Sequence, residues 1–218
     1  MLNERIILMI LEGTRDTLYM TLVSAICAYF IGIIAALILY LTNKGGLAEC
    51  KPVYAVLDII VNLFRSVPFI ILMLLVRPLT ILIAGKSYGP TATIVSLVVA
   101  AAPYVARMVE SSLMEIDKGV IEAAISMGAS IPKIIWKVLL PESAPSLIVG
   151  VTISVGTIFS YSAMAGAIGG GGLGDIAIRY GYQRYQTDIM IVTVIVMVVL
   201  IQLIQVIGMS LAKHVDRR

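Results

Sequence analysis

Long stretches without charge dominate the pattern of hydrophobic and polar positions along the chain. A helix needs about 20 consecutive apolar residues to cross a bilayer. The stretches are continuous and lack the alternation of apolar and polar residues that is typical of barrel strands. We therefore predict membrane-spanning helices near 17–41, 88–106, 145–168 and 189–211.

A fifth candidate span lies near 53–76. It contains Asp58 and Arg65 but is otherwise strongly apolar, with the runs IIVNLF and SVPFIILMLLV. With this segment the pattern predicts an all-α polytopic membrane protein with five transmembrane helices, and an odd number of spans places the two termini on opposite sides.

Composition supports an integral membrane protein and excludes two other classes. Hydrophobic residues make up 60% of the 218 residues and charged residues 13%, and the mean hydropathy is +1.01. Soluble domains carry about 25% charged residues. A net charge of +3 is too small for a nucleic-acid-binding surface, so we expect lipids and no nucleic acid as surroundings.

Positively charged residues set the expected orientation, because short cytoplasmic loops are enriched in Lys and Arg. With the C-terminus inside, nine cations are cytoplasmic and six are external, and the tail KHVDRR strengthens the bias. We predict an external N-terminus, a cytoplasmic C-terminus and a single transmembrane domain over 1–218 with its core near 13–211. The first apolar stretch, at 6–11, is too short for a signal peptide, so we expect no cleavage.

The longest polar connection runs from about Arg107 to Glu142 and is then cytoplasmic. It predicts the end of a long third helix, then a short helix around GVIEAAISMGA and another around PKIIWKVLL. We expect Pro141 and Pro145 to break the chain before the fourth span.

A motif with a fixed spacing occurs inside this connection. Glu122-Ala123-Ala124 is followed after three residues by Gly128, and after nine more by Val138, one residue and Leu140-Pro141. The small residues give a short helix a bare side on which another protein can approach the backbone, and Glu122 offers a charged contact. The alternative is an interfacial helix that rests on lipid headgroups.

This spacing resembles the EAA motif of ABC importer permeases, with Val138 in place of the usual Ile. Further stretches resemble the methionine-uptake permeases within that group, and they are NLFRSVPFIIL, APYVARMVE, YSAMAGAIG, GLG and RYGY. The resemblance implies a type I ABC importer permease fold in the cell (inner) membrane. It also implies a homodimer that sits on two copies of a cytoplasmic ABC ATPase and receives methionine from an extracytoplasmic binding protein.

The resemblance further implies a cytoplasmic coupling loop at about 116–142. The residues expected to couple to the ATPase are Glu122, Ala123, Ala124, Gly128, Leu140 and Pro141.

Four residues are candidates for the translocation path or its gate. Arg65 shares a helix face with Asp58, and such a residue faces either the path or a carboxylate or helix end that ties it structurally. Tyr161 and Ser162 belong to a span rich in small and polar residues, which suits a path or a tight helix contact. Met164 stands among alanines, where a flexible apolar side chain suits either a gate or ordinary packing.

The glycine run at 169–172 and Gly174 satisfy G-x-G-x-x-G on paper, but no strand precedes them, so a dinucleotide site is rejected. We expect a flexible hinge there, and close backbone packing at Gly166, Gly170 and Gly174 is the alternative. The chain has no G-x-x-x-x-G-K-[ST] and only one histidine, His214, so no cofactor and no metal are expected.

The alternative function is a self-sufficient secondary transporter or channel. Against it, no Asp, Glu or His lies deep in a predicted span, and Asp58 is the one marginal candidate for carrying a coupling proton. The sequence offers no nucleophile with its base, so we expect a transporter subunit and not an enzyme.

Overall fold

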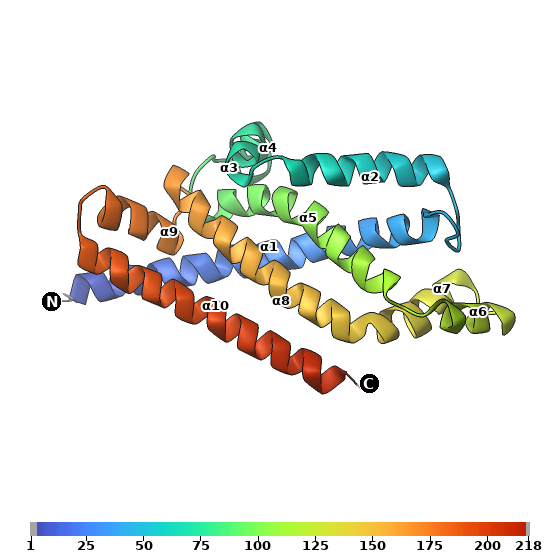
Figure 1. Cartoon of the computed structure of the whole chain (residues 1–218). Helices are drawn as coiled ribbons and strands as arrows, with labels where there is room; N and C mark the ends of the chain where they lie inside the picture. The colour runs from blue at the N-terminus through green and yellow to red at the C-terminus, as the bar shows by residue number, and fades with distance from the viewer. Residues whose placement is uncertain (1–3, 217–218) are drawn as a thin grey trace.

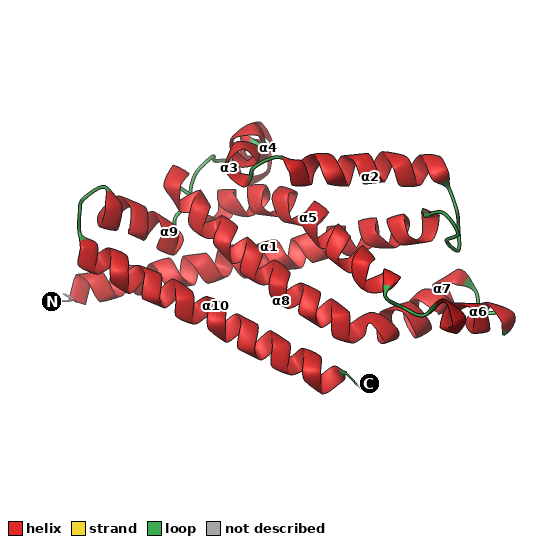
Figure 2. Ribbon diagram, in the orientation of Figure 1, coloured by secondary structure: helices red, strands yellow, loops and turns green. Residues whose placement is uncertain are grey.

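The computed structural model describes residues 4–216, and every regular element in that range is a helix (Figure 2). The expected domain limits at 1 and 218, with the tail cations Arg217 and Arg218, lie outside the described residues. The elements are α1 (Glu4–Thr42), α2 (Lys51–Ser66), α3 (Phe69–Leu75), α4 (Arg77–Ala84), α5 (Pro90–Met114), α6 (Lys118–Ser126), α7 (Ile131–Ile134), η1 (Ile135–Leu139), α8 (Leu140–Ala165), η2 (Gly166–Ile168), α9 (Gly172–Ile176), η3 (Ala177–Tyr182) and α10 (Thr187–Val215).

Within the described residues, four helical segments are long and apolar enough to cross a membrane. They are α1, α5, the continuous stretch Ile131–Ile168, and α10. The fifth predicted span is broken: α2 and α3 form a pair bent by 108°, and counting that pair as one crossing gives five. Pro68 causes the break, because proline forces the preceding Val67 into an extended conformation, here with φ −83° and ψ 126°.

The expected break before the fourth span is wrong. The helix continues from η1 into α8 through Pro141, and Pro145 lies inside α8. The reason is the wide π-helical turn of η1, in which the N–H of Leu140 bonds the carbonyl of Ile135, five residues back. The wider turn makes room for a proline ring at the next position, where no N–H is available to continue the regular pattern.

The long helices run roughly along one direction, with α1, α5 and α8 in the middle of the bundle (Figure 1). α2 lies along one side and α10 along the other, while α6 and α7 project from the end where α5 finishes (Figure 1). The start of α1 and the end of α10 lie at opposite ends of the bundle (Figure 1). This arrangement agrees with an odd number of crossings.

The centre of the bundle is the contact between α1 and α5, which is built from small residues. A Cβ placed on Gly32 of α1 would lie 2.6 Å from a methyl group of Val105 on α5. Ala28 and Ala36 of α1 and Ala101 of α5 are almost completely buried in the same cluster. Small side chains let the two backbones approach closely, which is how helices gain packing energy in lipid.

The glycine-rich segment after α8 is a compact turn. A Cβ on Gly166 would overlap the backbone of Gly174 and Asp175, and one on Gly174 would overlap the backbone of Ala163. The N–H of Leu173 donates to the buried hydroxyl of Thr17 on α1, 2.8 Å away. These contacts support the close-packing alternative for Gly166 and Gly174 over the expected hinge.

α10 also approaches its neighbour through a glycine. A Cβ on Gly208 would overlap the side chain of Thr152 on α8, with the Thr152 Cβ only 2.8 Å away. Thr152 is 5% exposed, and a β-branched side chain has little freedom to rotate away.

We therefore expect Gly208→Ala to destabilise the protein by about 1–3 kcal/mol, the usual cost of overfilling a packed contact. The matched control is Gly150→Ala, because a Cβ there meets only Met108 at 3.7 Å; it should be neutral or slightly stabilising, since alanine favours helix. Thermal unfolding of the two variants in detergent measures the difference. Equal melting temperatures would contradict the close contact of α8 and α10.

Candidate functional site

The segment that carries the EAA motif begins and ends at defined caps. The carboxylate of Asp117 accepts the N–H of Gly119 at 2.6 Å and so caps the start of α6. At the other end the N–H of Gly128 bonds the carbonyl of Ile125 at 2.8 Å, and that of Ala129 bonds Ala124 at 3.1 Å. This pair of bonds is a Schellman motif, which requires the left-handed conformation that Gly128 adopts, with φ +72°.

The two alanines of the motif point in different directions. Ala124 is 8% exposed and packs in the core with Ile134 and Leu139, whereas Ala123 is exposed beside Glu122. Ala124 was expected on the bare side of the helix, and this is wrong because the face of α6 that carries it holds the segment against its own chain.

Three of the six expected coupling residues share the accessible surface, namely Glu122, Ala123 and Gly128. Nothing lies within 4 Å of a Cβ built on Gly128. Leu140 and Pro141 lie at the start of α8, where Leu140 is half-buried and Pro141 is exposed. The motif therefore has two parts. Glu122, Ala123 and Gly128 are at the surface, and Leu140 and Pro141 lie where the chain enters the fourth span.

Large apolar side chains surround this surface at the projecting end of the molecule. Those exposed by a third or more are Val120, Ile125, Met127, Ile131 and Trp136. Met127 and Trp136 are 83% and 70% exposed. An exposed apolar group of this kind suits contact with another protein or with lipid. Among the five, the residue type alone marks only Trp136 as suited to an interface, because the other four are indistinguishable from core residues in a short amphipathic helix.

The four candidate path residues have different surroundings, although three of them lie on α8. The ring of Tyr161 stacks on Phe69 with centroids 4.6 Å apart. Ser162 is 1% exposed and donates its hydroxyl to the carbonyl of Phe159 at 2.7 Å. Met164 is 46% exposed, and Arg65 is exposed on α2. In the single chain, Tyr161 and Ser162 therefore act in packing, and Met164 is the accessible residue of the α8 group.

The accessible side of α8 continues from Met164 along a polar groove. Ser160 and Thr157 bond their own helix carbonyls at 3.1 and 3.0 Å. With Gly156 and with Gln205 of α10 they line an open groove of about 400 Å³. Gln205 was missed from the sequence, although a glutamine inside a charge-free span is itself a signal, because an amide in hydrocarbon needs a partner.

Asp58 is tied to another helix and not to Arg65. It forms an ion pair with Arg107 of α5, and Arg107 also bonds Glu110 at 2.7 Å. Arg107 and Glu110 were missed, because the third span was expected to end before them. Glu110 is 3% exposed in the last turns of α5, four residues before Met114, and is a buried acidic residue that the sequence did not single out.

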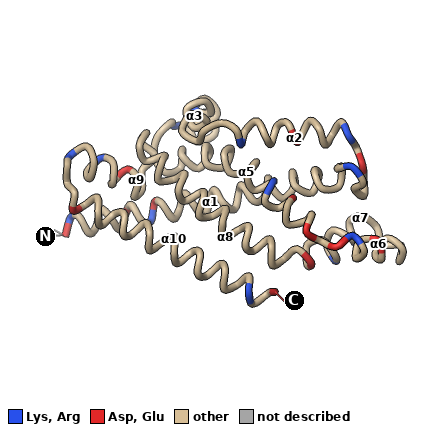
Figure 3. Tube along the Cα trace, in the orientation of Figure 1, with Lys and Arg blue, Asp and Glu red and all other residues tan. Residues whose placement is uncertain are grey.

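Titratable groups are otherwise spread out. Charged residues gather toward the two ends of the bundle, and few lie along its middle (Figure 3). Among residues 4–216, no three His, Cys, Asp or Glu side chains gather closely enough to hold a metal ion.

Comparison with known proteins gives matches along nearly the whole chain. The family described as "Binding-protein-dependent transport system inner membrane component" matches residues 28–218. The probable D-methionine transport system permease protein MetI of Vibrio cholerae is 50% identical over 96% of this chain and 93% of its own length. The methionine import system permease protein MetP of Bacillus subtilis is 46% identical over 95% and 93%.

Solved structures give the same result. A chain from inward-facing conformations of the MetNI methionine ABC transporter superposes with a TM-score of 0.97 and 43% identity, covering 99% of this chain and 100% of that one. A chain of an amino acid ABC transporter crystallised with histidines has a TM-score of 0.78 at 19% identity, covering 94% of each chain, and is similar in fold.

Proposed function

Because the chain belongs to the family of binding-protein-dependent transport system inner membrane components, we propose that it is the permease subunit of an ABC importer for methionine. The observation that carries the proposal is the superposition, over almost its whole length, on a chain of the MetNI methionine ABC transporter. The family resemblance inferred from the EAA motif is confirmed, and the protein is a multi-pass component of the inner membrane.

ATP hydrolysis belongs to a separate cytoplasmic ABC ATPase in this proposal. The chain contains no G-x-x-x-x-G-K-[ST] phosphate-binding loop. The exposed surface of Glu122, Ala123 and Gly128, with the apolar side chains around it, offers a docking site at the end of the bundle. Nucleotide binding then favours one arrangement of the transporter over another, and α6 passes that preference to α5 and α8.

The remaining partners follow from the same proposal. Two copies of this chain form a homodimer, with the path along the two-fold axis and the accessible side of α8 near it. Met164 and the groove lined by Ser160 are the groups on that side. An extracytoplasmic methionine-binding protein delivers the substrate at the other end, and lipids surround the outer helices.

The proposed topology places the N-terminus outside and the C-terminus in the cytoplasm. It is supported by the excess of Lys and Arg on the side of α6 and by the opposite positions of the chain ends (Figure 1). The whole chain then acts as one permease domain, with its core near 13–211 and its coupling loop at about 116–142.

The alternative of a self-sufficient secondary transporter has less support. Its best proton carriers, Asp58 and Glu110, are both engaged in ion pairs with Arg107.

Reconstitution tests the function directly. The chain purified with its co-purifying ATPase and binding protein should take up labelled methionine into vesicles when ATP is supplied, and L- and D-methionine should be assayed in parallel with other amino acids. A lone chain that transports methionine without an ATPase would contradict the proposal and favour the alternative.

Gly128→Leu should abolish most uptake and uncouple ATP hydrolysis, because the leucine side chain holds the docked surfaces apart. The left-handed conformation adds a local cost of about 1–2 kcal/mol, so the matched control is Gly85→Leu. Gly85 also ends a helix, with φ +71° and nothing within 4 Å of its Cβ, but it lies outside the coupling loop. The control should fold with the same strain and keep transporting. Equal uptake by both variants would remove the docking role of Gly128.

Met164→Cys should cross-link into a dimer, and Ser162→Cys, two residues away and buried, should not. Both variants are made after Cys27 and Cys50 are replaced by serine. Gel electrophoresis after oxidation in native membranes reads out the result. A dimer band from Ser162→Cys alone, or a monomer that transports, would contradict the proposed dimer contact along α8.

A further inference from the structure

α2 packs on the bundle through one stripe of apolar side chains, in which Tyr54, Leu57 and Phe64 are partly buried against residues of α1, α3 and α5. Val61 is its one buried residue. The apolar side chains of its outer face are exposed, namely Val53, Val56, Ile59, Ile60 and Leu63. Lipid tails are as apolar as these side chains, so no hydrophobic driving force presses α2 against its neighbours. Polar interactions between α2 and α5 therefore add to the packing of this stripe.

A closed polar cluster provides them. Arg107 of α5 pairs with Asp58 of α2 and donates to the side-chain amide oxygen of Asn62 at 3.1 Å. Asn62 in turn donates its amide to Asp58 at 3.1 Å, and Glu110 holds the other side of Arg107 at 2.7 Å. The Arg107 and Asp58 side chains are 21% and 28% exposed. Charges in such a place persist only when they are paired.

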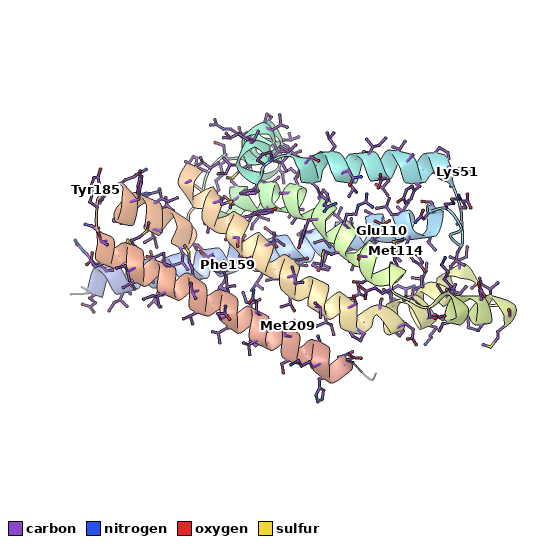
Figure 4. All side chains as sticks on the ribbon, in the orientation of Figure 1. Lys51, Glu110, Met114, Phe159, Tyr185 and Met209 are labelled. Atoms are coloured by element: carbon purple, nitrogen blue, oxygen red, sulfur yellow. The ribbon has the colours of Figure 1, made fainter. Side chains whose placement is uncertain are left out.

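The cluster lies close to the end of the molecule from which the coupling loop projects. Arg107 comes seven residues before the end of α5 at Met114, and Asp58 comes seven residues after the start of α2 at Lys51. At 1.5 Å per residue, each lies about 10 Å from the end of its helix. Figure 4 labels Glu110 and Met114 near this end of α5.

α5 and α6 are joined rigidly at this end. Only three residues separate them, and Ile116 in that link is 6% exposed in the cluster that also holds Ala124 of α6. A displacement of α6 therefore reaches the end of α5.

The chain changes direction at both ends of α2. The link from α1 passes through Gly45, with φ +77°, and the pair of α2 with α3 is bent by 108°. Neither connection forces α2 to move together with α5.

We propose that Arg107 is a positioning residue that makes α2 follow α5, so that movement of the coupling loop reaches α2 through the pair with Asp58. The inference rests on the proposed ATP-driven transport. It assigns a role to a residue outside the EAA motif. The role belongs to the ion pair of Arg107 with Asp58, which joins two helices, and not to the ion pair of Arg107 with Glu110, which lies within α5.

Two single substitutions separate these pairs. Asp58→Asn removes the charged tie between α2 and α5, while Arg107 stays neutralised by Glu110 in its own helix. Glu110→Gln is the matched control, because it removes a carboxylate from Arg107 but keeps the pair with Asp58. Each variant replaces one carboxylate by an amide of nearly the same shape, so both should insert into the membrane and fold.

Asp58→Asn should lower the methionine taken up per ATP hydrolysed by about fivefold or more, the lower end of typical coupling between sites, and Glu110→Gln should change it much less. A second readout uses spin labels at Val56 of α2 and Met114 of α5, which are both 59% exposed, after Cys27 and Cys50 are replaced. Asp58→Asn should broaden the distribution of distances between the labels, with or without the ATPase, and Asp58→Glu should restore both properties in part.

The outcomes distinguish this inference from the proposed function. A broadened distribution with unchanged uptake per ATP would reduce the pair to a structural tie and overturn the inference, as would an unchanged distribution. Equal losses in Asp58→Asn and Glu110→Gln would also overturn it. If the unmodified complex shows no ATP-driven uptake, the proposed function fails, whereas the distance measurement still tests whether the pair holds α2.

Discussion

The close approach of α1 and α5 is the contact on which the rest of the structure depends. In lipid, helices associate through tight packing and hydrogen bonds and gain little from burying apolar surface. Gly32 lets the backbone of α1 meet Val105, and the alanines on both sides keep the two helices together over much of their length. α8 packs against this pair, α10 crosses α8 at Gly208, and the compact glycine turn is held to α1 through Thr17. The helices of the bundle therefore make these contacts at glycine and alanine residues, whose small side chains let the backbones approach.

Polar interactions add to the packing where fewer side chains are buried. α2 buries one residue and is held by the cluster of Asp58, Asn62, Arg107 and Glu110. The proposed coupling loop combines close packing with hydrogen bonds. Ala124 packs it against the core, while Asp117 and Gly128 fix the ends of α6. A rigid segment with a defined start and end, joined by three residues to α5, suits the transmission of movement in an ATP-driven importer. The same caps explain why Gly128 has a backbone role besides leaving its surface open.

Sequence reasoning predicted the positions of the spans and of the short helix that carries the EAA motif, but it missed several contacts. The third span was ended at 106 and the rest of its helix was assigned to the cytoplasmic connection, so the pairing of Arg107 and Glu110 with residues of the bundle was not foreseen. Proline was taken to break the chain before the fourth span, but the π-helical turn of η1 accommodates Pro141. The sequence left Ser162 open between the path and a tight helix contact, and its side chain is buried against its own helix. In each case the deciding contact comes from a neighbouring turn or another helix.

The sequence by itself determined that the chain is an all-helical membrane protein, where its apolar segments lie and where its EAA motif stands. Those features depend on local quantities: the cost of a charge in hydrocarbon acts on each residue separately, and a motif is a spacing along one chain. Only the tertiary structure decided that Asp58 pairs with Arg107 and not with Arg65, that Ala124 faces inward while Ala123 faces outward, and that the second apolar segment bends by 108°. The rotation of a helix about its own axis is set by the neighbours against which it packs, and these come from distant parts of the chain.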